Sequence, residues 1–231
     1  MVAALQRSRQ LPEPTVARLP IYQRIAREWI RRGNERIDSP TLGRLAGVAA
    51  ATVRRDLSGL GPLGTRGAGY DTVVLDRTIE NVLGQNIRYD VIVVGLGNLG
   101  RALVNSTNFL ISGATLVGLY DVNPDVIGTV VNDCEVESFH GEIAPATLAV
   151  LCVPAQHAQS AADRLVEQKI HAILNFAPQV VTVPVGTAVR YVDFSIELQI
   201  LAYHLTNGTG PLGGGVLHSL GISPPVAAPR V

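Results

Sequence analysis

The stretch Asp90-Val91-Ile92-Val93-Val94-Gly95-Leu96-Gly97-Asn98-Leu99-Gly100 decides the fold of this chain. A β-branched apolar run leads directly into a Gly-x-Gly-x-x-Gly motif and a helical pattern, which predicts a strand, a tight turn and a helix. In such a turn the first glycine permits the bend, the second lets the backbone approach a pyrophosphate, and the third allows helix and strand to pack closely. N–H groups at the helix start face the phosphates. The cofactor-binding residues predicted for this dinucleotide site are Gly95, Leu96, Gly97, Asn98, Leu99 and Gly100.

A second apolar run, residues 115–120, predicts the neighbouring strand, and Asp121 follows it at the spacing expected for a ribose-binding acid. A carboxylate there accepts hydrogen bonds from the adenosine ribose and repels a 2′-phosphate, which favours NADH and NAD over NADP(H). The other interpretation of Asp121 is a cap for the turn at Asn123-Pro124. We expect the helix after the glycine motif to run to about Ile111, and residues 122–145 to hold a short helix or an extra strand.

The alternation of strands and helices continues to residue 192, so the fold class is α/β with a Rossmann-type parallel sheet. An apolar strand at 147–153 ends in Pro154, and a strand at 172–174 leads into Asn175-Phe176-Ala177-Pro178. Ligands of open parallel sheets bind at the carboxyl ends of the strands. The residues that we therefore expect to border the nicotinamide half of the dinucleotide are Pro154, Asn175, Phe176 and Ala177.

The last predicted helix, capped by Asp193, carries apolar side chains around nearly its whole circumference. A helix that packs only on its own sheet would show a single apolar stripe, so we expect this one to lie between domains or between subunits. Glycine or proline occupies ten of the 25 positions from 207 to 231, which predicts a disordered tail.

The net charge of zero conceals a basic N-terminal part and an acidic remainder. Residues 1–70 contain twelve arginines and five acidic residues, a net charge of +7, and the remaining residues contain seven basic and fourteen acidic side chains, a net charge of −7. A compact basic segment favours a polyanion and an acidic remainder repels one, so we expect nucleic acid to be bound by the N-terminal part alone. The other interpretation is a solvated arginine-rich surface.

Apolar periodicity in this basic part predicts helices over residues 15–33, 39–47 and 50–58. Ser39 is expected to cap the second of them. Two short helices separated by a glycine-containing turn predict a helix-turn-helix, whose second helix enters the major groove of DNA. The glycine-dense residues 59–70 predict the wing of a winged helix-turn-helix. The side chains expected to contact DNA are Thr52, Arg54, Arg55 and Ser58 from the helix and Arg66 and Gly67 from the wing.

A connecting helix capped by Asp71 is expected to end at Gly84, and a hinge follows at residues 85–89. The apolar stripe predicted for this helix is Val74, Ile79, Val82 and Leu83. The predicted segments are a winged-helix DNA-binding domain with its arm and connecting helix at 1–84, an NAD(H)-binding Rossmann domain at 85–192, the last helix at 193–206 and the tail at 207–231.

Other classes of site receive little support. Cys134 and Cys152 are the only cysteines, and because their spacing matches no metal signature we expect two reduced structural thiols rather than a sensor disulfide. No apolar run approaches the length of a membrane span, and the apolar stretch after Met1 is too short for a signal peptide. We therefore expect a cytoplasmic protein with no membrane or metal partner.

Several segments together resemble the Rex family of bacterial redox-sensing transcriptional repressors, over roughly residues 10–206. They are Arg18-Leu19-Pro20-Ile21-Tyr22, Ala51-Thr52-Val53-Arg54-Arg55-Asp56-Leu57-Ser58, Gly64-Thr65-Arg66-Gly67-Ala68-Gly69-Tyr70, Gly95 to Gly100, Ile173-Leu174-Asn175-Phe176-Ala177-Pro178 and Val192-Asp193. The wing and Asn-Phe-Ala-Pro segments are specific to the family, whereas the glycine motif is not. The resemblance implies a homodimer that binds double-stranded operator DNA, with the last helix domain-swapped between subunits.

The same resemblance implies a mechanism. NADH closes the Rossmann domains and moves the two DNA-binding domains, so that their recognition helices no longer match successive major grooves, whereas NAD⁺ competes weakly and permits DNA binding. Asp193 matches the family residue that joins Arg18 in a state-dependent network, and it is also expected near the cofactor. We expect Arg18 and Asp193 to form the switch, the other interpretation being an ordinary helix cap and a surface arginine.

Three features depart from the family pattern. Ser106 stands where members usually have a tyrosine near the nicotinamide, Gly59-Leu60 replaces an aromatic pair, and residues 122–146 are short. One alternative is therefore a DNA-binding paralogue that holds NAD as a structural ligand. The other is an NAD-dependent dehydrogenase, which needs an acid or base near the nicotinamide, where His157 and His171 are the only nearby candidates. Such an enzyme has no use for a basic N-terminal part, so we expect no catalytic residues.

Overall fold

The structure is a computed structural model, and it describes residues 11–63, 68–84, 87–106 and 113–207. The predicted tip of the wing, with Arg66 and Gly67, and the predicted tail beyond Asn207 lie outside these ranges, whereas Asn207 itself is the last residue of the final helix. The chain divides into two compact units, which are residues 1–84 with 201–231 and residues 85–200. No helix within the described ranges is long and apolar enough to cross a bilayer.

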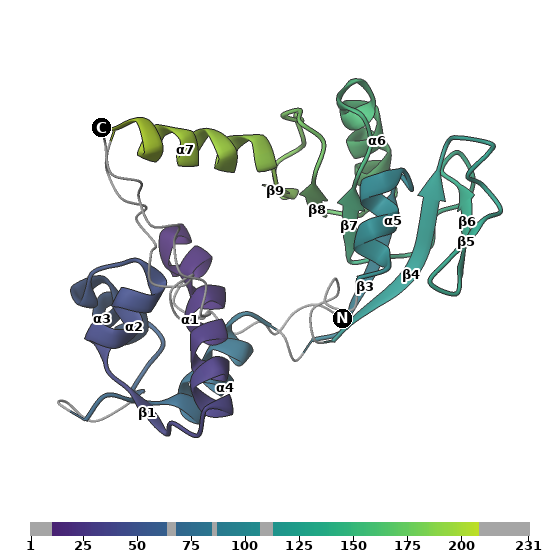
Figure 1. Cartoon of the computed structure of the whole chain (residues 1–231). Coiled ribbons are helices and arrows are strands. Elements are labelled where there is room, and N and C mark those ends of the chain that lie inside the picture. Colours follow the sequence, from purple (N-terminus) through teal and green to yellow (C-terminus); the bar gives the residue numbers. More distant parts are fainter. Residues whose placement is uncertain (1–10, 64–67, 85–86, 107–112, 208–231) are drawn as a thin grey trace. The chain divides into compact units, whose positions relative to one another are not determined.

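The N-terminal unit has the winged helix-turn-helix order that the sequence predicts (Figure 1). Its elements are α1 (Glu13–Arg31), β1 (Arg36–Ile37), α2 (Ser39–Ala46), α3 (Ala50–Ser58), β2 (Tyr70–Asp71) and α4 (Thr72–Val82). The two short strands pair antiparallel, with Ile37 opposite Tyr70. Buried side chains from all four helices form one core, among them Leu19 and Tyr22 of α1. The predicted helix-turn-helix is therefore confirmed, and the short sheet is an element that the sequence analysis does not include.

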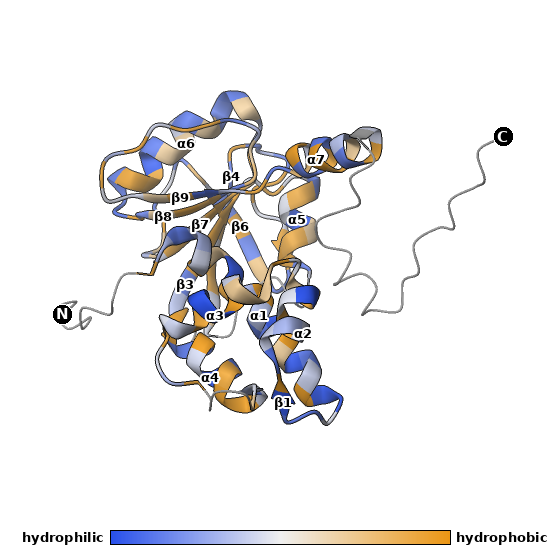
Figure 2. Ribbon diagram, turned by 90° about the vertical axis from the view of Figure 1, so that its left-hand side faces the viewer, coloured by the Kyte–Doolittle hydropathy of each residue, from blue (hydrophilic) through white to orange (hydrophobic). Residues whose placement is uncertain are grey.

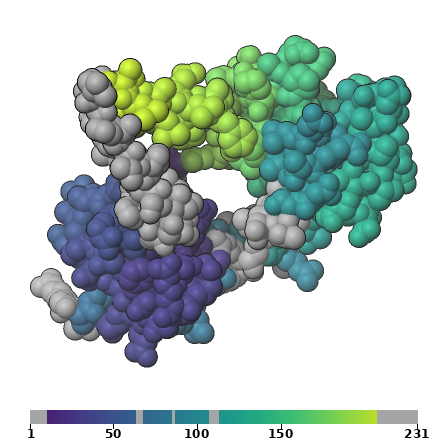
Figure 3. Space-filling model, viewed as in Figure 1, coloured from purple at the N-terminus to yellow at the C-terminus, as the bar shows by residue number. Residues whose placement is uncertain are grey.

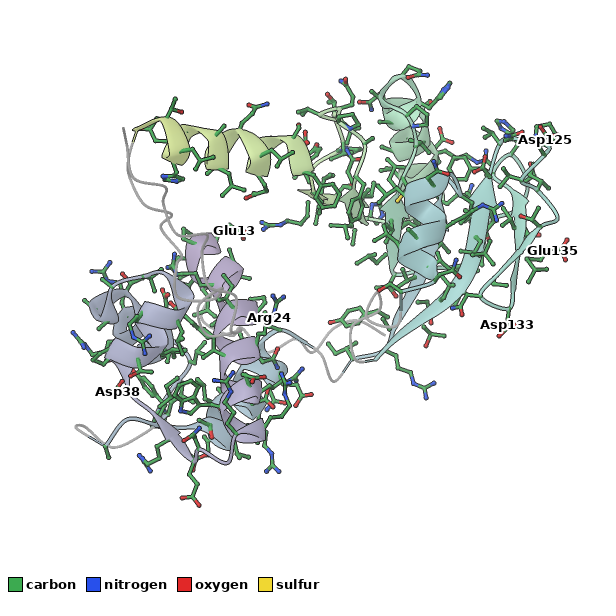
Figure 4. The ribbon with its side chains drawn as sticks, viewed as in Figure 1. Glu13, Arg24, Asp38, Asp125, Asp133 and Glu135 are labelled. Carbon is green, nitrogen blue, oxygen red and sulfur yellow. The ribbon has the colours of Figure 1, made fainter. Side chains whose placement is uncertain are left out.

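The cap of α2 differs from the expectation. Asp38 caps the helix in place of Ser39, because its carboxylate accepts a hydrogen bond of 2.8 Å from the Thr41 N–H group. A carboxylate at this position also interacts favourably with the positive end of the helix dipole. Figure 4 shows Asp38 at the start of α2.

The buried face of α4 also differs from the expectation. Asp71 caps the helix as predicted, but Val74 and Val82 are exposed, whereas Leu75 and Ile79 are fully buried. Residues four apart lie on one helix face, and the pair 75 and 79 has this spacing. The predicted stripe is therefore wrong in two of its members.

The second unit is a sheet of seven strands within the described ranges, followed by a helix. Its elements are β3 (Tyr89–Val94), α5 (Asn98–Val104), β4 (Ala114–Asp121), β5 (Val130–Val131), β6 (Cys134–Ser138), β7 (Leu148–Leu151), α6 (Ala155–Glu167), β8 (Ala172–Asn175), β9 (Ala188–Tyr191) and the first part of α7 (Phe194–Asn207), up to Ile200. The strand order is β5-β6-β4-β3-β7-β8-β9, and every pair is parallel except β5 with β6. The order reverses direction at β3, so the carboxyl ends of β3 and β7 flank a switch point, where such sheets bind ligands.

Alternate residues of β3 enter two apolar layers. Val91 and Val93 share one layer with Val104 of α5, whereas Ile92 and Val94 share the other with the buried alanines and Leu165 of α6. Successive side chains of a strand point to opposite faces, and helices cover both faces here. This burial explains why the deciding stretch is apolar without alternation, and Figure 2 shows the hydrophobic colour along the central strands.

Several element bounds differ from the prediction. α5 ends at Val104 rather than near Ile111, and residues 107–112 lie outside the described ranges. Residues 122–145 hold the extra strands β5 and β6 rather than a short helix, which decides between the two possibilities left open. Asp121 is the last residue of β4 rather than the residue after it.

α7 does not bury its apolar side chains within the single chain. Their exposed fractions run from 47% to 86%, for Phe194, Ile196, Leu198, Ile200, Leu201, Tyr203 and Leu205. The surface of α7 forms a yellow-green ridge in the space-filling view (Figure 3). The expected burial of this helix is therefore not met by its own chain, and an intersubunit contact stays a prediction.

Candidate dinucleotide site and DNA-binding helix

Three glycines form the turn after β3 for different reasons. Gly95 has a φ of +94°, and a Cβ atom there would lie 2.6 Å from the Cys152 carbonyl oxygen. A Cβ atom on Gly100 would collide with the Gly95 carbonyl oxygen. Gly97 has a φ of −67°, and a Cβ atom there would meet no atom within 4 Å. Neither backbone strain nor internal packing requires glycine at this exposed position, so the open space suits the close approach of a ligand.

The peptide groups of Leu96 are held from both sides. The Leu96 N–H group donates to Asp121 Oδ2 at 2.6 Å, and the Leu96 carbonyl oxygen accepts from Arg101 Nε at 2.9 Å. Arg101 Nη2 also donates to Thr129 Oγ1 at 3.0 Å, which ties the turn to the segment between β4 and β5. The sequence analysis does not identify Arg101, because nothing in a helical pattern shows which loop a guanidinium reaches.

Asp121 caps the turn after β4 and also contacts the glycine turn, and its role in ribose binding stays a prediction. Its Oδ1 atom accepts hydrogen bonds of 2.7 and 2.9 Å from the N–H groups of Val122 and Asn123, which caps the turn after β4. Its Oδ2 atom accepts the bond from Leu96. A carboxylate oxygen has two acceptor positions, so Oδ2 keeps one for a ribose hydroxyl. The carboxylate lies beside the glycine turn, as a ribose-binding acid must.

The turn after β8 is built by the buried side chain of Asn175. Its Oδ1 atom accepts from the Ala177 N–H group, and its Nδ2 atom donates to the Gln179 carbonyl oxygen, both at 2.9 Å. Ala177 is buried and Phe176 is half-buried. Asn175 therefore shapes the turn, and its amide is already engaged on both of its atoms. Pro154 is exposed at the start of α6, beyond the carboxyl end of β7.

The start of α7 is attached to this turn. The Val192 N–H group donates to the Asn175 carbonyl oxygen at 2.9 Å, and the rings of Phe194 and Phe176 have centroids 6.4 Å apart. Asp193 caps α7 as predicted, because its Oδ1 atom accepts from the Ser195 N–H group at 2.8 Å and from the Ser195 hydroxyl. These hydrogen bonds lower the pKa of Asp193. A change at the turn can therefore reach the base of α7.

The two histidines do not form an acid/base site at this edge. His171 precedes β8 and lies at the amino end of that strand, where its Nδ1 atom is 3.4 Å from Thr187 Oγ1. His171 is therefore a strand-edge residue, at the opposite end of β8 from the predicted dinucleotide site. His157 is exposed in the first turn of α6, and Ser106 is exposed just after α5.

Both cysteines are free thiols. Burial raises the pKa of Cys152 to about 12, and burial also raises the pKa of Cys134. Such thiols are poor nucleophiles at neutral pH. Within the described ranges, no group of three or more histidine, cysteine or acidic side chains is placed to hold a metal ion.

α3 presents to solvent most of the polar side chains assigned to DNA. Val53 and Leu57 are buried, whereas Arg54, Arg55 and Ser58 are exposed and Thr52 is half-buried. Arg54 Nη1 donates to Ser39 Oγ at 3.0 Å. The Arg55 guanidinium has no hydrogen bond or ion pair with any residue in the described ranges. Gly43 permits the tight turn between α2 and α3, because a Cβ atom there would lie 2.6 Å from the Val48 carbonyl oxygen.

Arg18 is paired within the N-terminal unit. Its guanidinium donates two hydrogen bonds to the carboxylate of Asp56 on α3, from Nε at 2.7 Å and from Nη2 at 2.9 Å. Burial alone would raise the pKa of Asp56, but the bonds from Arg18, Tyr22 and Thr15 outweigh it and lower that pKa. The sequence analysis treats Asp56 only as part of the family motif. Its partners lie 34 to 41 residues away along the chain.

The root of the wing is held by Arg36. Its guanidinium donates to the carbonyl oxygens of Ala68 and Gly69, at 2.6 and 2.9 Å. Acidic side chains gather in the second unit at the edge of the sheet that β5 forms, where Figure 4 shows Asp125, Asp133 and Glu135. This distribution agrees with a polyanion bound by the N-terminal unit.

Two family models match the chain in sequence order. A model described as the N-terminus of putative DNA-binding proteins matches residues 10–58, the segment of α1, α2 and α3. A model described as a CoA binding domain matches residues 86–179, the segment from β3 to the turn after β8.

Curated relatives match nearly the whole chain. The redox-sensing transcriptional repressor Rex of Streptomyces coelicolor is 41% identical over 227 residues, which are 96% of this chain and 86% of the relative. The protein of the same name from Roseiflexus sp. is 38% identical over 206 residues, which are 87% of this chain and 94% of the relative.

Solved structures of a Rex-family repressor, RSP, share the fold. RSP itself has a TM-score of 0.76 at 31% identity and covers 92% of this chain and 99% of its own. RSP in complex with β-NAD⁺ and operator DNA has a TM-score of 0.77 at 33% identity, and covers 86% of this chain and 94% of its own. A third structure holds RSP with β-NADH. The chain described here belongs to the Rex family of redox-sensing transcriptional repressors, which are regulators rather than enzymes.

Proposed function

We propose that this chain binds operator DNA through α3 and its wing, binds NADH and NAD at the turn after β3, and releases the DNA when NADH is bound. The observation that carries the proposal is made at Gly97. Neither the backbone conformation nor the packing requires glycine there, so the close approach of a ligand explains it. The exposed arginines of α3 support the DNA-binding part, as do the relatives' names and the complexes of RSP with operator DNA and both cofactors.

The residues around the turn suit a dinucleotide. Asp121 holds the peptide group before Leu96 and keeps one acceptor position for a ribose hydroxyl, and Arg101 holds the peptide group after Leu96. The cofactor supplies a nicotinamide ring that is neutral when reduced and cationic when oxidised. The residues proposed to border that ring are Phe176, Ala177, Asn175 and Pro154.

We also propose a cytoplasmic homodimer. The support is the set of exposed apolar side chains on α7, which no surface of the same chain covers in the described ranges. A dimer presents two copies of α3 to two half-sites of an operator, which a monomer cannot do. DNA as the partner supports the cytoplasm as the compartment.

Arg18 and Asp193 are proposed as the switch, with the pairing of Arg18 and Asp56 as one of its states. Asp193 lies at the base of α7, which is attached to the turn after β8, so closure at the dinucleotide site can displace it. NADH can shift the equilibrium between the two states of the switch only by the difference between its affinities for those states. A hundredfold preference supplies about 2.7 kcal/mol per site.

The test is a titration of the purified full-length protein on DNA. A duplex is first selected from random sequences by the wild-type protein, and binding to it is then measured by fluorescence anisotropy against increasing NADH and increasing NAD⁺. We expect NADH to release the duplex at concentrations where NAD⁺ does not. Arg55→Ala is expected to lose the duplex while its affinity for NADH, measured by calorimetry, is unchanged.

Two results contradict the proposal. If DNA binding is unchanged at saturating NADH, the protein does not sense redox state, and the result favours a DNA-binding protein with a structural ligand. Failure to select any duplex removes the DNA-binding function itself. NADH oxidation with trial 2-hydroxy or 2-oxo acids is followed at 340 nm in the same samples, and turnover would support the dehydrogenase instead.

A further inference from the structure

A buried carboxylate joins α1 to α3. Asp56 is 2% exposed and accepts four hydrogen bonds, all of them from α1. Thr15 Oγ1 and Arg18 Nη2 donate to Oδ1 at 2.8 and 2.9 Å, and Arg18 Nε and Tyr22 Oη donate to Oδ2 at 2.7 and 2.8 Å. Each oxygen therefore accepts its full number of two bonds.

This arrangement constrains rotation of α3 about its axis. Its three donors occupy one face of α1, at spacings of three and four residues, and the two bonds from Arg18 lie in the plane of the guanidinium. A carboxylate that is 2% exposed would lose its hydrogen-bond partners if it turned away from these donors, and little water is available to replace them. Apolar packing of Val53 and Leu57 has no such directionality.

The DNA-facing arginines directly precede this carboxylate. Arg54 and Arg55 are the two residues before Asp56, so in a helix of 3.6 residues per turn the direction of Asp56 determines theirs. A bidentate contact to a base edge depends on that direction, whereas attraction to phosphates depends mostly on the charge.

We propose that Asp56 is a positioning residue for sequence recognition, through which α1 sets the direction in which Arg54 and Arg55 meet the DNA. This inference rests on the proposed function, because it takes α3 as the recognition helix. It predicts that loosening the contact lowers discrimination between DNA sequences more than it lowers general affinity for DNA.

The experiment uses variants of the full-length protein without added cofactor. Arg18→Gln removes the bidentate donor, and Tyr22→Phe removes one hydroxyl donor while keeping the ring in the core. Arg27→Gln is the matched control, because it removes the same charge from α1 and breaks an ion pair with Asp76 of α4 instead of α3. Binding to the selected duplex and to a shuffled duplex is measured over a range of salt concentrations, and urea unfolding identifies variants that are not folded.

We expect Arg18→Gln to lower the ratio of selected to shuffled affinity by roughly 5- to 150-fold, the equivalent of one bidentate base contact. Tyr22→Phe should lower it by about threefold or more. Arg27→Gln should lower both affinities alike, since it removes a positive charge and leaves the contact between α1 and α3 intact.

An unchanged ratio in folded Arg18→Gln and Tyr22→Phe, or an equal loss in all three variants, refutes the positioning role. Either result leaves the proposed function intact provided that the wild-type protein selects a duplex. If the wild-type protein selects none, the proposed function fails first, so the two failures are distinguishable.

Discussion

At Gly97 a Cβ atom would meet no atom within 4 Å, whereas at Gly100 it would collide with the carbonyl oxygen of Gly95. Gly97→Ala should therefore change the free energy of unfolding by no more than about 1 kcal/mol and still weaken NADH binding by at least about tenfold, because the methyl group occupies the space for the pyrophosphate. Gly100→Ala should lose both stability and NADH binding. Urea unfolding and isothermal calorimetry on the two variants measure the two quantities.

Gly100→Ala is the control for Gly97→Ala, because both substitutions add one methyl group to the same turn. Equal destabilisation by both substitutions would show that Gly97 serves packing, and undiminished NADH affinity in Gly97→Ala would show that no ligand approaches this position.

Asp56 makes the stability of the N-terminal unit dependent on pH. Its pKa is lowered in the folded state, so its contribution is complete above the unfolded value, about 3.9, and is lost as the pH falls through the lower folded value. At pH 7 Asp56→Asn should cost about 3 kcal/mol, the low end for a broken buried pair because Arg18 is 25% exposed. The difference between wild type and variant should shrink below pH 4.

The fluorescence of Trp29, the only tryptophan, reports this unfolding from within α1. Asp76→Asn serves as the control, because Asp76 forms an exposed ion pair with Arg27 and should cost less than about 1 kcal/mol. A difference for Asp56→Asn that stays constant from pH 7 to pH 3 would contradict the assignment of a depressed pKa.

At the scale of the elements, Arg101 connects α5 with the turn and with Thr129. Arg101→Gln should weaken NADH binding by about fivefold, because about 1 kcal/mol of hydrogen bonding that holds the Leu96 carbonyl group is lost. Arg101→Lys keeps the charge but cannot donate in both directions, and it should also lose affinity.

Calorimetry with NADH measures the effect of Arg101, and Arg88→Gln, at an exposed position before β3, is the matched control. If Arg101→Lys binds NADH as tightly as wild type while Arg101→Gln does not, the positive charge determines affinity, and the hydrogen bonds from Arg101 to Leu96 and Thr129 do not.

Elements with a local signal could be predicted from the sequence. The strand, turn and helix around Gly95, the helix-turn-helix and the cap at Asp71 all follow from residues within a few positions of one another. Arg101, Asp56 and the two short strands β1 and β2 could not be predicted in this way, because their partners are distant in the sequence. Whether Asp38 or Ser39 is the cap depends on the position of the helix start to within one residue, which the apolar periodicity does not resolve.

At the scale of the whole molecule, α7 is the element that its own chain leaves incomplete. Its exposed apolar side chains occupy more than one face, and burying a leucine contributes about 1.5–3 kcal/mol relative to leaving it exposed. The double variant Leu198→Asp and Leu205→Asp should therefore be a monomer, because two carboxylates would have to be desolvated at the subunit contact. Analytical ultracentrifugation should give the dimer mass for wild type and half of it for the variant.

Loss of the dimer should also remove selective DNA binding, although α3 itself is unchanged. Two linked copies of α3 gain roughly 10²- to 10⁴-fold over one copy, and the variant should lose that factor on the selected duplex while binding shuffled DNA almost as before. Gln199→Asp is the control, since it places one of the two added negative charges at an exposed polar position of α7 instead. A double variant that sediments as a dimer would show that subunits meet elsewhere, whereas a monomer that keeps its selectivity would show that one copy of α3 is sufficient.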